Sequence, residues 1–96
     1  MLPEFDPLLH SELRLKIVSL LVGLNSAEFT HILNETGATR GNVSVQLRKL
    51  RDADYIMIDK TFGSSYPVTT CKITDKGLKA FEDYVEAIST YLKLRE

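Results

Sequence analysis

The sequence predicts an α+β fold in which three helices precede a two-stranded β-hairpin and one long helix closes the chain. Two changes in the spacing of apolar residues lead to this prediction. Apolar residues recur every three or four positions up to about residue 53, strand-forming residues replace that pattern from 55 to 73, and the helical spacing returns from 74 to 95. A chain of 96 residues with 44% hydrophobic content fits a single domain, 1–96, near the lower limit for burying its own core.

The first helix is expected to begin at Asp6 and Pro7, because Asp caps free N–H groups and Pro suits the first helical position. Apolar side chains at three- and four-residue spacing then form one stripe for burial: Leu9, Leu13, Ile17, Leu20, Leu21 and Leu24. Gly23 and Asn25 mark the end of this helix.

Two shorter helices are expected next, separated by a tight turn. Ser26 is the expected cap of the second helix, and Gly37 suits the left-handed residue that ends it. Thr39 is the expected cap of the third helix, 39–53, whose inward stripe consists of Val43, Leu47 and Leu50. A turn of a few residues that contains glycine is what a helix-turn-helix requires.

The hairpin 55–73 has two strands rich in strand-forming residues, joined by a turn that contains Gly, Ser and Pro. A hairpin that follows a helix-turn-helix is a wing. The complete prediction is therefore a winged helix-turn-helix, followed by a long helix, 74–95, with Thr74 as its cap.

The last helix carries two apolar stripes side by side. One consists of Leu78, Phe81, Val85, Ile88 and Leu92, and the other of Ala80, Tyr84, Ala87, Tyr91 and Leu94. Together they cover roughly 200° of the helix surface, about twice what one core-facing side needs. A small domain cannot bury both, so one stripe is expected to pack on its own domain and the other on the same helix of a second subunit. The predicted homodimer interface contains Tyr84, Ala87, Ile88, Tyr91, Leu92 and Leu94.

Positive charge gathers in the middle of a chain whose net charge is -1. Residues 36–51 contain four cations and no acidic residue. A regional basic surface of this kind is typical of nucleic-acid binding, whereas a merely solvated helix face is the alternative interpretation.

Opposite its buried stripe, the third helix presents side chains that suit DNA. Arg can bind guanine bidentately, Asn can pair with adenine, and Val can contact a thymine methyl group. Gly41 would let the helix N-terminus approach a phosphate closely. The predicted contacts of helix 39–53 in the major groove are Thr39, Arg40, Gly41, Asn42, Ser44, Val45, Gln46, Arg48 and Lys49. Gln46 lies nearer the core boundary and suits either role.

In the wing, four residues are predicted to reach the DNA backbone or the minor groove: Lys60, Ser64, Ser65 and Tyr66. The tip of this hairpin contains no Lys or Arg, so its electrostatic attraction is expected to be modest. A hairpin that mainly closes the core is the alternative.

Catalytic and metal-binding patterns do not stand out in the sequence. His10 and His31 lack partners at a metal-ligand spacing, and Cys71 alternates onto the core face of its strand. Glycine-rich phosphate loops and nucleophile elbows are also missing. We therefore expect a protein that is not an enzyme and uses no metal or cofactor. The single cysteine and the lack of a long apolar or secretory segment predict a cytoplasmic location without membrane contact.

Three segments resemble small stand-alone winged-helix transcriptional regulators related to the MarR and ArsR groups: HSELRLKIVSLL, ATRGNVSVQLRKLRDADYI and ITDKGLKAFEDY. This resemblance covers nearly the whole chain. It implies a dimeric DNA-binding repressor or activator, with the third helix in the major groove, the wing along the flanking backbone and the terminal helices in the dimer. The chain departs from such proteins at positions 64–68, where Arg or Lys is usual, and at Gln46, where His or Ser is common. Residues that match the recognition helix are Thr39, Arg40, Asn42, Ser44, Val45, Arg48 and Lys49.

The leading hypothesis is a homodimeric, sequence-specific regulator that binds double-stranded DNA, with hairpin 55–73 as its wing. A winged-helix protein-interaction module without DNA binding is the runner-up, favoured by the acidic overall balance and the cation-poor wing. A redox or metal sensor that uses Cys71 with His10 or His31 is a third hypothesis. The residues do not specify the target sequence, the sense of regulation or a small-molecule effector, which would have to bind at the dimer interface.

Overall fold

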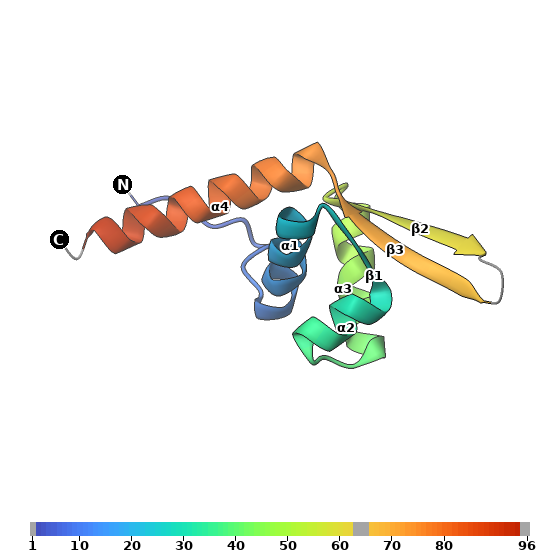
Figure 1. Ribbon diagram of the computed structural model, residues 1–96. Coiled ribbons are helices and arrows are strands. Elements are labelled where there is room, and N and C mark those ends of the chain that lie inside the picture. Colours follow the sequence, from blue (N-terminus) through green and yellow to red (C-terminus); the bar gives the residue numbers. More distant parts are fainter. Residues whose placement is uncertain (1, 63–65, 95–96) are drawn as a thin grey trace.

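The computed structural model describes residues 2–62 and 66–94 (Figure 1). Its elements are α1 (Glu12–Leu24), β1 (Ser26–Glu28), α2 (Phe29–Thr36), α3 (Arg40–Asp52), β2 (Ile56–Phe62), β3 (Pro67–Ile73) and α4 (Asp75–Lys93). The architecture is α+β and is a winged helix, as predicted. Helices α1 to α3 gather below one end of the sheet, while α4 and the far end of the β2–β3 hairpin extend in opposite directions (Figure 1). None of the described helices is both long and apolar enough to cross a membrane.

The start of α1 was predicted five residues too early. Asp6 does act as a cap, since its Oδ1 accepts a hydrogen bond from the Leu8 N–H at 2.8 Å. However, the turn that follows closes only once, from the His10 N–H to the Asp6 carbonyl, before Ser11 adopts an extended conformation (φ -148°, ψ 128°). The Asp-Pro pair therefore specifies a single turn, and the helix itself begins at Glu12.

Ser26 was predicted to cap a helix, but it opens the short strand β1. This strand pairs antiparallel with β3 in the register Ser26↔Lys72, Ala27↔Cys71 and Glu28↔Thr70. The sheet thus has three strands in the order β1-β3-β2, one more than the predicted hairpin. A strand of three residues leaves no periodic signal of its own, because its partner lies more than 40 residues away in the sequence.

The predicted helix ends around the helix-turn-helix are confirmed. Gly37 ends α2 with a left-handed φ of 69°, and the Thr39 hydroxyl accepts from the Asn42 N–H at 3.2 Å. At the start of α4 the Thr74 hydroxyl accepts from the Gly77 N–H at 3.0 Å. The predicted inward stripe of α3 is fully or almost fully buried: Val43, Leu47 and Leu50.

A tight joint connects the start of α4 to the turn between α3 and β2. The Tyr55 carbonyl accepts a hydrogen bond from the Thr74 N–H at 3.1 Å. A Cβ on Gly77 would lie 2.2 Å from the same carbonyl oxygen. Only glycine lets the first turn of α4 pass this close to the backbone of the turn.

The two stripes of α4 have different surroundings within the chain, and these surroundings bear on the predicted dimer surface. Tyr84 and Ala87, both placed in that surface, are buried within the chain at 7% exposure. The N-terminal segment runs beside α4 (Figure 1) and packs Phe5 against Tyr84 and Tyr91, with ring centroids 5.4 and 5.0 Å apart. The Tyr91 hydroxyl also donates to the Pro3 carbonyl at 2.8 Å. Because these first residues form no helix, their position along α4 could not be inferred from the stripes.

The other stripe of α4 remains open. Val85 is 46% exposed and Leu92 57% exposed. Together with Leu15 and Ser19 of α1, this stripe lines an apolar groove of about 430 Å³. The structure therefore leaves apolar surface of α4 uncovered around Val85 and Leu92, in a groove that the largely buried Tyr84 also lines.

Candidate nucleic-acid interface

The buried stripe of α3 determines which side chains this helix presents to solvent. With Val43, Leu47 and Leu50 in the core, the exposed residues are Thr39, Arg40, Gly41, Asn42, Val45, Arg48 and Lys49, while Ser44 and Gln46 lie half-buried at the border. A Cβ on Gly41 would meet nothing within 4 Å, so packing within the chain does not require glycine there. The helix thus offers a small residue at its N-terminal end and cations further along.

A groove of about 320 Å³ separates α3 from the wing, and it concentrates positive charge. The described residues that line it include four cations and no carboxylate: Arg40, Arg48, Arg51 and Lys60, together with Phe29, Ser44, Leu47, Ile58 and Thr69. The structure therefore brings the predicted Lys60 of the wing to the predicted Arg40 and Arg48 of α3. Such a groove is suited to a polyanion.

The charges of this groove are mostly unneutralised by the chain itself. Within residues 2–62 and 66–94, the only one of its four cations that forms an ion pair is Arg51, at 3.3 Å from Asp52. Both side chains of that pair are well exposed, so it contributes little and can be exchanged for a phosphate. Arg51 was not among the predicted contacts, because in sequence it lies at the end of the helix and only the wing reveals its place in the groove.

Aromatic packing and a side-chain network orient two of the predicted contacts. The guanidinium of Arg40 lies over the Phe29 ring, 5.5 Å from its centroid. Arg14 of α1 donates to the Gln46 Oε1 at 2.5 Å, and the Gln46 Nε2 donates to the Asn42 Oδ1 at 3.0 Å. Gln46 therefore holds the Asn42 side chain through its Oδ1, and the Asn42 amide nitrogen takes no part in this network. Arg14 in turn holds Gln46, and the sequence carried no signal for this contact.

The outer half of the wing provides the side chains that line the grooves beside α3. Lys60 pairs with Thr69 across the hairpin and lines the groove beside α3. Tyr66 is exposed and lines a second groove of about 350 Å³ with Arg40 and Glu28. The predicted Ser64 and Ser65 lie outside the described residues. The inner half of the hairpin closes the core, with Ile56 and Cys71 buried, whereas its outer half leaves Lys60 and Tyr66 exposed.

Cys71 has no property of a thiol sensor. Its side chain is fully buried, and this burial raises the pKa of the thiol to about 11. The thiol thus stays protonated and inaccessible at neutral pH, which is the opposite of what a reactive cysteine needs. Across the described ranges, the side chains of His, Cys, Asp and Glu form no group of three that could hold a metal ion.

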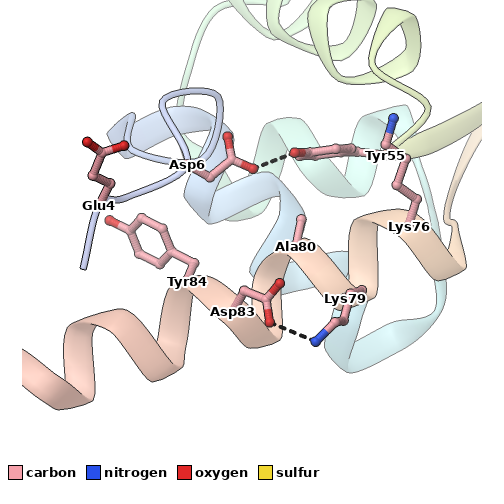
Figure 2. Close-up of a pocket in the computed structure, with 8 residues that line it drawn as sticks. All are labelled: Glu4, Asp6, Tyr55, Lys76, Lys79, Ala80, Asp83 and Tyr84. Atoms are coloured by element: carbon pink, nitrogen blue, oxygen red, sulfur yellow. Dashed lines mark hydrogen bonds and ion pairs between the residues drawn. The ribbon is translucent and has the colours of Figure 1, made fainter.

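A separate polar pocket of about 290 Å³ lies where the N-terminal segment meets α4 (Figure 2). The Tyr55 hydroxyl donates to the Asp6 carboxylate, and Lys79 forms an ion pair with Asp83 at 2.9 Å. Burial, and to a lesser extent the Asp6 hydrogen bond, raise the pKa of Tyr55 to about 12. Charges of both signs are interleaved here, so the pocket lacks the single sign that a polyanion site needs. The hydrogen bond between Tyr55 and Asp6 attaches the N-terminal segment to the turn before β2.

The sequence matches the family described as winged helix DNA-binding domain over residues 13–92, a range that includes every described residue of the groove. It is 34% identical to the uncharacterized protein MJ0432 of Methanocaldococcus jannaschii over 79 residues, 82% of this chain and 86% of that protein.

Two solved structures share the fold. A transcriptional regulator homologue from Pyrococcus horikoshii OT3 is similar with a TM-score of 0.87 and 22% identity, over 93% of this chain and 88% of that chain. NadR in complex with 4-hydroxyphenylacetate is similar with a TM-score of 0.73 and 21% identity, over 94% of this chain and 66% of that chain.

Proposed function

The chain belongs to the family of winged helix DNA-binding domains, and on this premise we propose that it is a transcriptional regulator that binds double-stranded DNA sequence-specifically as a homodimer. The observation that carries the proposal is the groove between α3 and the wing, whose described lining holds four cations and no carboxylate. These four cations share one groove in a chain whose net charge is -1.

In this proposal α3 lies in the major groove. Its buried stripe turns Asn42, Val45 and Arg48 outward together, and these residue types match adenine, the thymine methyl group and guanine. Each good bidentate pair between a side chain and a base discriminates by about 1–3 kcal/mol. Gly41 lies where the helix N-terminus would meet a phosphate, and the absence of a side chain permits a close approach.

Cations around this helix would contact phosphates and position it. Lys60 and Arg51 flank the groove from the wing and from the end of α3, and Lys49 extends from the exposed face of the helix. Such contacts supply affinity without sequence information, and they release counterions when they form. Binding is therefore expected to weaken steeply as the salt concentration rises.

We place the dimer interface on the open face of α4. The exposed Val85 and Leu92 and the half-buried Phe81 and Ile88 continue into Leu15 of α1, which gives one apolar surface of the kind that a two-fold interface buries. Of the residues predicted from the sequence, Ile88 and Leu92 belong to this surface. Tyr84 and Tyr91 pack against Phe5 of the N-terminal segment, and Ala87 is buried within the chain. Leu94 is exposed but does not line the groove.

The test combines a selection from random duplex DNA with a double substitution, Arg48→Ala with Lys49→Ala. The selected sequence should be a palindrome, because each subunit of a two-fold dimer binds one half-site. The double variant should lose binding to this sequence and remain a dimer. Lys76→Ala with Lys79→Ala is the matched control, since it removes the same charge from exposed positions at the start of α4.

If the double variant binds as the parent does, α3 is not the recognition helix. If the parent shifts no duplex even at low salt, the proposed DNA binding is wrong and the protein-interaction module is favoured.

A further inference from the structure

The wing carries an exposed aromatic ring at the outer end of β2, next to a tip that contains no Lys or Arg. Phe62, the last residue of β2, is 84% exposed, the highest value among the large hydrophobic side chains of the described residues. Tyr66 is the first described residue on the other side of the hairpin and is also exposed. Aromatic side chains of this size dominate the energetics of an interface when a partner covers them.

The strand register determines the direction in which Phe62 points. Successive side chains of a strand alternate between its two faces, so Ile56, Ile58, Lys60 and Phe62 share one face of β2. Ile56 is buried in the core, and Ile58 and Lys60 line the groove beside α3. Phe62 therefore lies on the face of the wing that is turned toward the recognition helix.

Distance along the strand places the ring beyond the phosphate-binding cations. Two residues of a strand span roughly 7 Å, so Phe62 lies about that much further out than Lys60. With α3 in the major groove, a wing that reaches past the flanking phosphates arrives at the neighbouring minor groove. Proteins that contact the minor groove frequently use apolar side chains there, against sugars or between base steps.

We propose that Phe62 is a DNA-contacting residue, whose ring packs into the minor groove that flanks the major groove occupied by α3. The inference rests on the DNA binding proposed above. The ring replaces the electrostatic contact that a cation at the wing tip would make, and the four cations of the groove attract the DNA that it meets. Because pyrimidine–purine steps open most easily, Phe62 gives the flanks of the site a preference for such steps without any hydrogen bond to a base.

Two substitutions on opposite faces of β2 test this contact. Phe62→Ala should weaken binding to the selected duplex roughly tenfold, since burial of a phenyl ring contributes enough free energy for at least that factor. Met57→Ala is the matched control: Met57 is 54% exposed on the same strand, but its side chain is on the other face, and binding should stay unchanged. Neither variant should change the melting temperature, because both side chains are largely exposed.

Salt dependence separates an apolar contact from an ionic one. Phe62→Ala should shift the plot of log K against log salt concentration without changing its slope. Lys60→Ala should make the slope shallower by about 0.9 for each phosphate contact that is lost. A changed slope in Phe62→Ala would mean that the ring only positions a neighbouring cation, and it would overturn the proposal.

The chain contains no tryptophan, so Phe62→Trp introduces a single fluorescent reporter. Its emission should change on addition of duplex DNA, whereas the emission of Met57→Trp should not. Unchanged affinity in Phe62→Ala together with unchanged emission in Phe62→Trp would refute the contact and leave the exposed ring to a protein partner. Failure of the parent itself to bind DNA would contradict the proposed function, so the two failures are distinguishable.

Discussion

Replacement of Gly77 by alanine should destabilise the protein, although alanine is the better helix former. The added Cβ would lie 2.2 Å from the Tyr55 carbonyl oxygen, 3.0 Å from the Tyr55 carbonyl carbon and 2.9 Å from Cδ1 of Ile73. A flexible side chain could yield, but the carbonyl belongs to the backbone and already accepts from the Thr74 N–H. The first turn of α4 must therefore move away from the turn before β2.

The size of the effect follows from three contributions. Overpacking in a buried site costs about 1–3 kcal/mol, and loss of the Thr74 hydrogen bond adds about 1 kcal/mol. The higher helix propensity of alanine offsets about 1 kcal/mol of this destabilisation. The net loss of unfolding free energy is about 2 kcal/mol, which in a domain of this size lowers the melting temperature by roughly 10 °C.

The assay is thermal and urea denaturation followed by circular dichroism, with Gly23→Ala as the matched control. A Cβ on Gly23 of α1 would meet nothing within 4 Å, so this variant should be as stable as the parent or more stable, by roughly 0.5 kcal/mol. If Gly77→Ala were as stable as Gly23→Ala, the close approach of α4 to Tyr55 would be refuted.

Three further predictions concern the interface with DNA, the dimer and the buried thiol. Gly41→Ala should keep or slightly raise stability, because its Cβ points into open space, yet weaken DNA binding several-fold; unchanged affinity would mean that the start of α3 does not approach the phosphate backbone. Val85→Glu should give a folded monomer in sedimentation experiments, because Val85 is exposed in the single chain, whereas Glu86→Ala on the polar face should leave the dimer intact. A dimeric Val85→Glu would exclude the open stripe as the interface. The raised pKa of Cys71 means that the native state holds this proton more tightly than the unfolded state, so its contribution to stability is complete below pH 9 and is lost as the pH rises to about 11. Between pH 9 and 11, the free energy of unfolding measured by urea denaturation should therefore fall less in Cys71→Ala than in the parent. An equal fall in both proteins would show that other groups cause it.

The parts of the fold that local chemistry specifies were predicted from the sequence. The caps Thr39 and Thr74 and the left-handed Gly37 each depend on residues within one helical turn, so the sequence displays them directly. Strand β1 and the path of the N-terminal segment depend on partners far along the chain. Ser26 pairs with Lys72, and Phe5 packs on Tyr91. Neither contact can be predicted from the residues that are adjacent in the sequence.

In the candidate site, too, the features that depend on neighbouring residues were predicted, and those that depend on distant partners were not. The 3.6-residue period of α3 was enough to select its outward residues, because three buried side chains determine the rotation of the helix. Arg14, Arg51 and Phe62 were missed because their significance is spatial. Arg14 reaches Gln46 across two helices, Arg51 meets Lys60 only across the groove, and the face of Phe62 follows from the register of the hairpin.

Tyr55 connects the proposed DNA-binding surface to the proposed dimer surface. Its N–H donates to Leu50 of α3, its carbonyl accepts from Thr74 at the start of α4, and its hydroxyl donates to Asp6 of the N-terminal segment. One residue thus holds the end of the recognition helix, the start of α4 and the segment that covers α4. In a dimer joined through α4, this connection determines how far apart the two copies of α3 lie. Helix-turn-helix dimers bind half-sites whose centres are about one helical turn of DNA apart, or a multiple of it. A change at Tyr55 or Gly77 that leaves the chain folded should therefore alter the preferred half-site spacing and leave the sequence of each half-site unchanged.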